Sequence, residues 1–265
     1  NREKYLTTVR LDLHESIALF FAARLLSRHS DEKNLHVVSA LDKLATALPD
    51  RTIARHIAGT AEAVRQKGEH NPAFLQHLDL LTRAWADRKK VEIAYCSAAG
   101  KESQRVICPY FLDVSAIGYS TYVMGLDSLS GQIRIFKVER IKRARLLEEQ
   151  YEIPPDFDPH QQLAAGWGIM WGEETVEVRL RFSPAAARRV KESVWHHSQR
   201  IEDAPDGGCL FSVCIANTME IKPWIRSWGA DVEVLSPPEL RAELAEEVRA
   251  MARVYGVTPS AGAAT

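Results

Sequence analysis

Apolar residues recur at helical spacing through the first third of the chain. They form stripes with intervals of three and four residues, and Asp12 with Glu15 three positions later has the capping-box pattern of a helix start. The stretch 50–70 is less periodic. Helices are expected over 13–29, 34–48 and 72–88. Residues 1–88 are therefore predicted to be a mostly helical connector.

The period changes from helical to alternating at Lys90. Short runs of alternating apolar and polar residues follow at close spacing, separated by turns that contain Gly100, Gly118 and Gly131. Strands are expected over 91–95, 103–114, 119–126, 132–138 and 143–147. Short strands with no helix between them predict a small antiparallel β-barrel over 89–149.

A proline- and glycine-rich segment, 150–173, then loses all periodicity and is predicted to be a linker. Its aromatic residues are too many for a free linker, so we expect the segment to pack on a neighbouring surface. These residues are Tyr151, Phe157, Trp167 and Trp171.

The C-terminal third has the order strand, helix, strand, strand, helix, strand. That order predicts a ferredoxin-like domain over 174–256, whose last part is an extra helix that begins at Pro237 or Pro238. The tail 257–265 is rich in small residues and is expected to be disordered. The fold class predicted for the whole chain is α+β.

The composition is that of a folded protein of the cytoplasm. Hydrophobic residues make up 46% and charged residues 26% of the chain. No apolar run approaches the roughly 18 residues needed to cross a bilayer. The four cysteines form no C-x-x-C pair and are expected to be small buried thiols in a reducing compartment. The chain begins at Asn1 rather than Met, which indicates that upstream residues are missing.

Positive charge is concentrated in one segment of a nearly neutral chain. Residues 88–145 hold eleven Lys or Arg against five Asp or Glu, a local net charge of +6. Such a segment favours an anionic ligand, for which nucleic acid and nucleotides are the commonest candidates. A solvated basic surface without a partner is the alternative, and composition alone leaves both open.

No arrangement of residues points to catalysis, a metal or a cofactor. The phosphate-binding glycine motifs and the nucleophile-elbow motif are missing. His196 and His197 are adjacent, so their side chains are expected to point to different sides and to lie at the surface rather than bind a metal. We therefore predict that the chain is not an enzyme and needs no cofactor.

The strand over 132–138 is the most informative element for binding. Alternation puts Arg134, Phe136 and Val138 on one face, followed by Arg140 if the strand continues. Ile133 and Ile135 take the other face, which is expected to be the core. An exposed arginine beside an aromatic ring can contact a phosphate while the ring stacks on a base. The alternative is an ordinary exposed strand face.

The segment 105–141 resembles the core of the WYL-domain family. That family's pattern is Arg, a Pro-aromatic pair, Trp-Tyr-Leu before a small residue, and then R-x-F-x-x-x-R-I. The matching residues here are Arg105, Pro109–Tyr110, Tyr122–Val123 with Gly125, and Arg134, Phe136, Arg140 and Ile141. The chain departs from the pattern at the name-giving triplet, where Thr121 replaces the tryptophan.

The resemblance extends beyond the barrel. Residues 176–255 resemble the C-terminal extension that often follows WYL domains, and 11–27 resemble the connector that joins them to a winged helix-turn-helix. The winged helix itself is not part of this chain. The resemblance implies a Sm-like or SH3-like barrel that binds a negatively charged ligand, a nucleic-acid fragment or nucleotide, and thereby modulates promoter binding by the attached winged helix.

The resemblance also implies a homodimer, with the connector and the C-terminal extension in the interface. The ligand-binding positions it assigns are Arg105, Tyr110, Tyr122, Arg134, Phe136, Lys137 and Arg140. Two functions follow as hypotheses. The first is the sensing part of a transcriptional regulator, and the second is a nucleic-acid-binding accessory protein that activates a partner effector without binding promoter DNA. Short single-stranded oligonucleotides are the expected ligands.

Overall fold

The computed structural model describes residues 9–30, 32–68, 71–115, 120–170, 172 and 174–257. Its packing divides the chain into an N-terminal unit, Asn1–Ile153, and a C-terminal unit, Pro154–Thr265. Helices come first and two antiparallel sheets follow, so the predicted α+β class is confirmed. The tail predicted to be disordered lies outside the described residues except for Val257.

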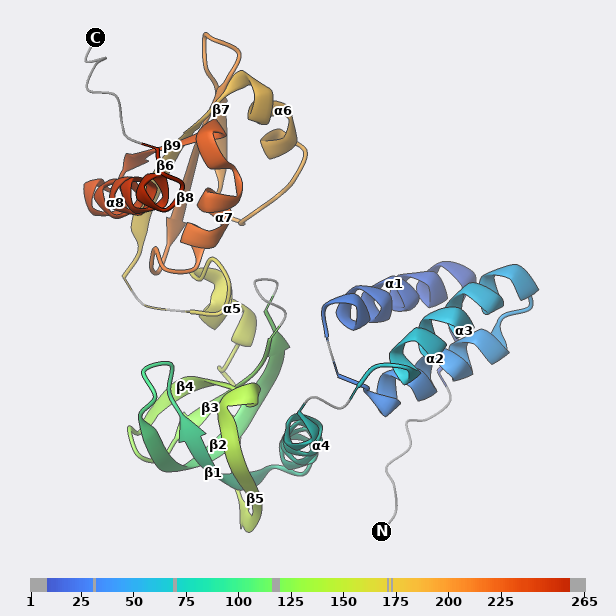
Figure 1. Ribbon diagram of the computed structural model, residues 1–265. Coiled ribbons are helices and arrows are strands. Elements are labelled where there is room, and N and C mark those ends of the chain that lie inside the picture. Colours follow the sequence, from blue (N-terminus) through green and yellow to red (C-terminus); the bar gives the residue numbers. More distant parts are fainter. Residues whose placement is uncertain are drawn as a thin grey trace. The chain divides into compact units, whose positions relative to one another are not determined.

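Three helices that pack on one another open the N-terminal unit (Figure 1). They are α1 (Leu13–His29), α2 (Leu35–Ala47) and α3 (Arg51–Arg65). The capping box at the start of α1 is confirmed, because the amide of Glu15 donates to Asp12 Oδ1 over 2.8 Å and the amide of Asp12 donates to Glu15 Oε2 over 2.7 Å. The shared core consists of Phe20, Val38, Leu41, Ile57, Ala61 and Val64.

Helix α3 occupies the stretch 50–70, where no helix was expected. Its buried positions are Ile57, Thr60, Ala61 and Val64. Asp50 provides the cap, since its carboxylate accepts the amides of Thr52 and Ile53. The description of this stretch as less periodic is wrong, because Ile53, Ile57, Ala61 and Val64 recur at intervals of four and three residues on the buried side of the helix.

Helix α4 (Pro72–Asp87) leads into the barrel and packs on β1, β2 and β5 (Figure 1). The strands are β1 (Lys89–Cys96), β2 (Glu102–Val114), β3 (Thr121–Asp127), β4 (Gln132–Lys137) and β5 (Ile141–Gln150), with a 3-10 turn, η1 (Val138–Arg140), before β5. The order is β4-β3-β2-β1-β5 and every pairing is antiparallel. This is the expected Sm-like or SH3-like barrel. Gly118 and Tyr119, expected at a turn and a strand start, lie outside the described residues.

The barrel core combines residues that alternate along the strands with residues of α4 and η1. Its buried members are Leu81, Ala84, Val91, Ile93, Ile107, Val123, Phe136, Val138 and Ile141. The strands β2 and β3 approach each other so closely that a Cβ on Gly125 would lie 2.2 Å from the Cys108 carbonyl oxygen, and only glycine fits there.

The end of β5 is tied back to the bulge in β2. A register shift between Pro109 and Phe111 accompanies a buried Tyr110, whose ring stacks on that of Tyr151 at a centroid distance of 5.9 Å. The Tyr151 hydroxyl donates to the Pro109 carbonyl, and burial raises the pKa of Tyr151 to about 12. The expectation that Tyr151 packs on a neighbouring surface is confirmed.

The C-terminal unit begins with α5 (Pro159–Ala164) and continues as a four-stranded sheet with helices. Its elements are β6 (Val176–Phe182), α6 (Pro184–Lys191), β7 (Arg200–Asp203), β8 (Cys209–Ile215), α7 (Ile221–Ser227), the 3-10 turn η2 (Gly229–Asp231), β9 (Val232–Ser236) and α8 (Pro238–Val254). The antiparallel order β7-β8-β6-β9 is that of a ferredoxin-like fold, as predicted. Residues of α6, α7 and α8 complete the core on one face of the sheet.

The segment that precedes β6 is hydrogen-bonded to this unit rather than free. The Glu220 carboxylate accepts three successive amides, from Gly168, Ile169 and Met170, over 2.9 to 3.0 Å. Trp167 packs beside Trp224 at a centroid distance of 4.9 Å, so its expected packing is confirmed. Trp171 lies outside the described residues.

The expected surface position of His196 is wrong. The side chain is 8% exposed, stacks on Trp167 and places Nε2 3.2 Å from the Gly166 carbonyl oxygen. Burial, followed by the neighbouring His197, lowers the pKa of His196 and favours the neutral ring. Adjacent polar residues gave no sign in the sequence that one of them holds a backbone segment in place.

Two further expectations concern the burial of the cysteines and the length of apolar helices. Cys108 and Cys209 are buried, but Cys214 is exposed, so the expectation of four buried thiols is wrong in part. All four thiols are free. Within the described ranges, no helix has the length and apolar character required to span a membrane.

Candidate anionic-ligand site

An ion pair between β2 and β3 lies on the inward side of the barrel. Ile107 is a core residue and pairs in register with Asp127, so Asp127 also faces inward, as does Arg105 two positions before Ile107. Arg105 Nη1 is 2.5 Å from Asp127 Oδ2. The Asp127 side chain is fully buried and that of Arg105 is 23% exposed, so water screens the pair poorly.

Asp127 is held as a carboxylate by several donors. Burial raises its pKa, but hydrogen bonds from the Ser130 hydroxyl and the Leu129 amide, together with Arg105, outweigh this effect and the net pKa is lowered. The Ser130 hydroxyl donates to Asp127 Oδ2 over 2.9 Å. Because Ser130 lies in the turn between β3 and β4, Asp127 fixes that turn to β2 through Arg105.

Arg134 joins the same network from the opposite side of the turn. Its Nε donates to Ser130 Oγ over 3.3 Å, and the rest of the side chain is exposed to solvent. The hydrogen bonds therefore run from Arg105 through Asp127 and Ser130 to Arg134. Asp127 neutralises Arg105 directly, whereas Arg134 has no carboxylate within 4.0 Å among the described residues.

Phe136 lies in the barrel core, and its predicted exposure is wrong. It is 3% exposed and meets Tyr95 edge to face at a centroid distance of 5.1 Å. Arg105 Cζ lies 5.8 Å from the Phe136 ring centroid, a cation–π distance. Arg134 and Phe136 do share a face, but it is the inner face. Ile133 and Ile135, expected in the core, are half-buried and outside it.

The remaining predicted site residues lie elsewhere on the barrel. Tyr122 and Lys137 pair across β3 and β4 on the outer face, and both are half-buried. Arg140 is half-buried in η1, while Tyr110 is buried under Tyr151. The structure thus brings Arg105, Arg134 and Phe136 together and separates them from the other four.

Unpaired positive charge is concentrated from the end of β4 to the start of β5. No carboxylate lies within 4.0 Å of five cations here, counting only described residues: Arg134, Lys137, Arg140, Lys142 and Arg143. Three cations elsewhere on the barrel do have such partners, in the pairs Lys89–Glu148, Lys90–Glu149 and Arg145–Glu92. The basic segment therefore becomes one uncompensated stretch, 134–143.

A hollow of about 440 Å³ opens beside this stretch. Its lining residues are Ala94, Tyr95, Glu102, Ser103, Gln104, Lys142 and Arg143. Ser103 Oγ accepts from Arg105 Nε over 3.0 Å, and Tyr95 contacts Phe136, so the hollow adjoins the ion pair. Its volume lies in the range of small-molecule sites. Two unpaired cations against one carboxylate give it a positive character.

The sequence prediction missed Tyr95, Asp127, Lys142 and Arg143 as parts of this region. Tyr95 continues the inward alternation of Val91 and Ile93, which is a signal that could have found it. Asp127 ends an inward alternation in the same way and could have been identified as the partner of an inward arginine.

Two domain models match the sequence. Residues 76–146 match the WYL domain and residues 174–252 match the WCX domain. The chain is a WYL-domain protein. The first match covers α4 and most of the barrel, and the second covers the ferredoxin-like sheet with most of α8. WYL-domain proteins are regulators or accessory proteins. A search of curated protein sequences found no match to this chain.

Solved structures resemble the WYL chain at low identity. Proteasome accessory factor B/C (PafBC) of Arthrobacter aurescens is 18% identical, with a TM-score of 0.39 over 93% of this chain and 37% of that one. A CRISPR Cas-related protein is 11% identical, with a TM-score of 0.50 over 96% and 88% of the two chains. The second likeness supports the fold alone. The WYL chain spans little more than a third of the PafBC chain.

We predict that Asp127→Ala lowers the free energy of unfolding by about 3 kcal/mol, because it leaves Arg105 half-buried without its partner. Urea denaturation measures the change. Glu92→Ala is the matched control, since it removes the carboxylate of the more exposed pair with Arg145 and is expected to cost less than about 1 kcal/mol. Equal effects of the two substitutions would contradict a structural role for the inner pair.

The same pair predicts a pH dependence. The folded-state pKa of Asp127 lies below its unfolded value, so its contribution to stability is fully present above the unfolded pKa. That contribution is lost as the pH falls through the folded pKa. Urea midpoints measured from neutral to acid pH are expected to converge for wild type and Asp127→Ala.

Proposed function

We propose that this chain is the ligand-sensing and dimerising region of a cytoplasmic regulator. Its WYL barrel binds a negatively charged ligand, a nucleic-acid fragment or nucleotide. The observation that carries this proposal is the stretch 134–143, whose cations have no carboxylate partner among the described residues, beside a hollow of about 440 Å³. Cations that are grouped and have no carboxylate partner attract phosphates over several ångströms and can form ion pairs with them.

The buried position of Phe136 changes how such a ligand is bound. Phosphates would be contacted by exposed cations such as Arg134 and Arg143, while Arg105 already has a carboxylate partner. The bases of the ligand would stack on a half-buried ring, either Tyr95 in the hollow or Tyr122 on the outer face. Phe136 supports the site indirectly, because its ring contacts both Arg105 and Tyr95.

The output of sensing is proposed to be promoter binding by a winged helix joined upstream of the connector, as the resemblance to the WYL regulator family implies. A ligand can change promoter affinity only if it prefers one arrangement of the DNA-binding domains over another. In a dimer, the two arrangements would differ in the distance between the two DNA-binding domains. Promoter half-sites require one defined spacing, so only one arrangement would fit them.

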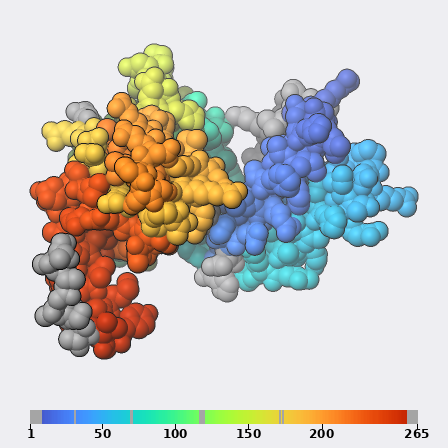
Figure 2. Space-filling view, turned by 90° about the horizontal axis from the view of Figure 1, so that it is seen from above, coloured from blue at the N-terminus to red at the C-terminus, as the bar shows by residue number. Residues whose placement is uncertain are grey.

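Helix α1 has the surface that a dimer needs. One side packs Phe20 into the helical core, but on the opposite side Phe21 is 61% and Leu25 57% exposed. With Ala18 and Ala22 they recur at intervals of three and four residues, which gives a second apolar stripe. The space-filling view shows α1, in dark blue, uncovered by α2 and α3 on the face seen (Figure 2).

The charges at the two ends of α1 favour a second copy of this helix as the occupant of that stripe. Glu15 lies in the first turn, and Arg28 and His29 lie in the last. A two-fold axis places identical surfaces against each other in opposite directions. Antiparallel pairing of α1 would therefore bring the acidic end of each helix beside the basic end of the other.

We expect fluorescently labelled eight-nucleotide DNA to bind the full chain, and Arg134→Ala with Arg143→Ala to weaken that binding. The slope of log affinity against log salt should fall by about 0.7 for each phosphate contact removed. Arg145→Ala is the matched control, because Arg145 lies on β5 with Arg143 but pairs with Glu92. Fluorescence anisotropy measures both quantities. The proposal would be contradicted if no binding were detected at low salt, or if Arg145→Ala lost as much affinity as the double variant.

We expect the double substitution Phe21→Glu and Leu25→Glu to convert a dimer into a monomer, because it places carboxylates in the apolar stripe. Leu19→Glu is the control, since Leu19 is 53% exposed but lies on another side of α1. Sedimentation equilibrium gives the mass of each variant. A monomeric wild type, or a double variant that stays dimeric, would contradict the interface.

A further inference from the structure

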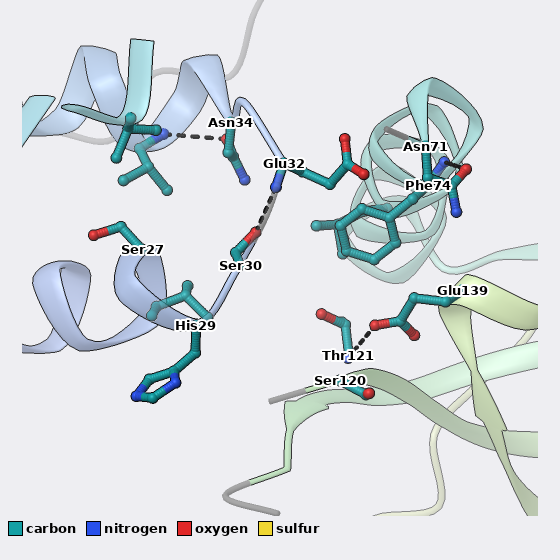
Figure 3. A pocket seen from close by; sticks show the side chains of 14 residues that line it. Ser27, His29, Ser30, Glu32, Asn34, Asn71, Phe74, Ser120, Thr121 and Glu139 are labelled. Carbon is teal, nitrogen blue, oxygen red and sulfur yellow. Dashed lines mark hydrogen bonds between the residues drawn. The ribbon is translucent and has the colours of Figure 1, made fainter. Parts of the chain in front are cut away.

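A second cavity in the N-terminal unit differs from the basic hollow in its chemistry. It has a volume of about 230 Å³ and lies between the end of α1, the start of α2, the start of α4 and the barrel (Figure 3). Among the described residues that line it are no Lys or Arg, and His29 is the only base. Its polar groups are mainly carboxylates, hydroxyls and side-chain amides.

Two carboxylate oxygens at this cavity are buried without a hydrogen-bond partner. Glu139 Oε1 accepts the amide of Thr121 over 3.1 Å, but its Oε2 has no partner within the described part of the chain. Glu32 Oε2, from the connection between α1 and α2, is likewise buried and has no hydrogen-bond partner among the described residues. A buried carboxylate oxygen without a donor is costly, so both oxygens favour a ligand that brings hydrogen-bond donors.

Thr121 adds a hydroxyl group to the wall of the cavity beside Glu139. Its side chain is 8% exposed, and its hydroxyl makes no hydrogen bond to any described residue. Figure 3 shows this hydroxyl on the cavity side, next to the Glu139 carboxylate. A threonine hydroxyl can both donate and accept a hydrogen bond, so this group is available to a molecule in the cavity. Thr121 also departs from the WYL pattern, which has tryptophan here.

The rest of the wall is apolar. Phe74 presents its ring to the cavity, and Leu26, Val37, Val64 and Leu78 line it as well (Figure 3). An aromatic face attracts a cation, and aliphatic walls suit a hydrocarbon body. A bare metal ion fits this wall less well, because it requires more oxygen ligands, and no group of three His, Cys, Asp or Glu able to hold one occurs among the described residues.

We propose that this cavity binds a small organic cation, a primary ammonium or guanidinium on a short apolar body. The charged group donates hydrogen bonds to Glu139 Oε2 and the Thr121 hydroxyl, and the body packs on the Phe74 ring, on whose other side Glu32 lies (Figure 3). The site would be separate from the anionic-ligand hollow and opposite to it in charge preference. Glu139, the one acid within 134–143, contributes to this cavity rather than compensating the cations beside it.

Isothermal titration of the full chain with phenethylammonium tests the site, and phenethyl alcohol serves as the uncharged probe of similar shape. We expect millimolar or tighter binding of the ammonium and at least about tenfold weaker binding of the alcohol, because hydrogen bonds to a charged group are strong. Glu139→Gln and Thr121→Val should each weaken ammonium binding by about tenfold, with circular dichroism confirming that each variant remains folded.

Glu152→Gln is the control, since Glu152 is an exposed carboxylate of the same unit that does not line the cavity. It should leave binding unchanged. Phe74→Leu provides a second test from a different element, α4, if a barrel substitution prevents folding, because it removes the aromatic ring on which the body packs. Undetectable binding of phenethylammonium at about 10 mM, equal affinity for the alcohol, or unchanged affinity in folded Glu139→Gln and Phe74→Leu would each overturn the proposal.

Discussion

The buried ion pair between Arg105 and Asp127 is the interaction on which the organisation of the barrel's inner face depends. An arginine inside a barrel must be neutralised, and a fully buried aspartate from the neighbouring strand does this at 2.5 Å. The same carboxylate accepts from Ser130 and so fixes the β3–β4 turn, from which Arg134 extends. Phe136 then packs against the guanidinium and against Tyr95.

This internal neutralisation separates two kinds of positive charge. Arg105 is part of the interior, whereas the cations of 134–143 have no carboxylate partner among the described residues and remain available to a ligand. Glu139 does not compensate them, because one of its oxygens accepts the Thr121 amide at the second cavity. The barrel thus keeps a basic stretch and a separate acceptor-lined cavity, and the short turn η1 between β4 and β5 contributes Arg140 to the first and Glu139 to the second.

Much of the fold could be predicted from local pattern, because strand alternation, glycine turns and caps are local properties. The face assignment of β4 could not. A period of two shows that Arg134 and Phe136 share a face, but it does not show which face is inside, and the exposed arginine at one end favoured the wrong choice. His196 and Asp127 were missed for a related reason, since their roles depend on partners distant in sequence.

The most direct test of the anionic-ligand site is a nuclear magnetic resonance titration of the isotope-labelled chain with short single-stranded DNA. The arginine side-chain signals of Arg134, Arg140 and Arg143 are predicted to shift most, and those of Arg179 and Arg181 on the sheet of the C-terminal unit are predicted to stay in place. Shifts confined to the C-terminal unit, with the barrel arginines unchanged, would contradict a ligand site on the WYL barrel.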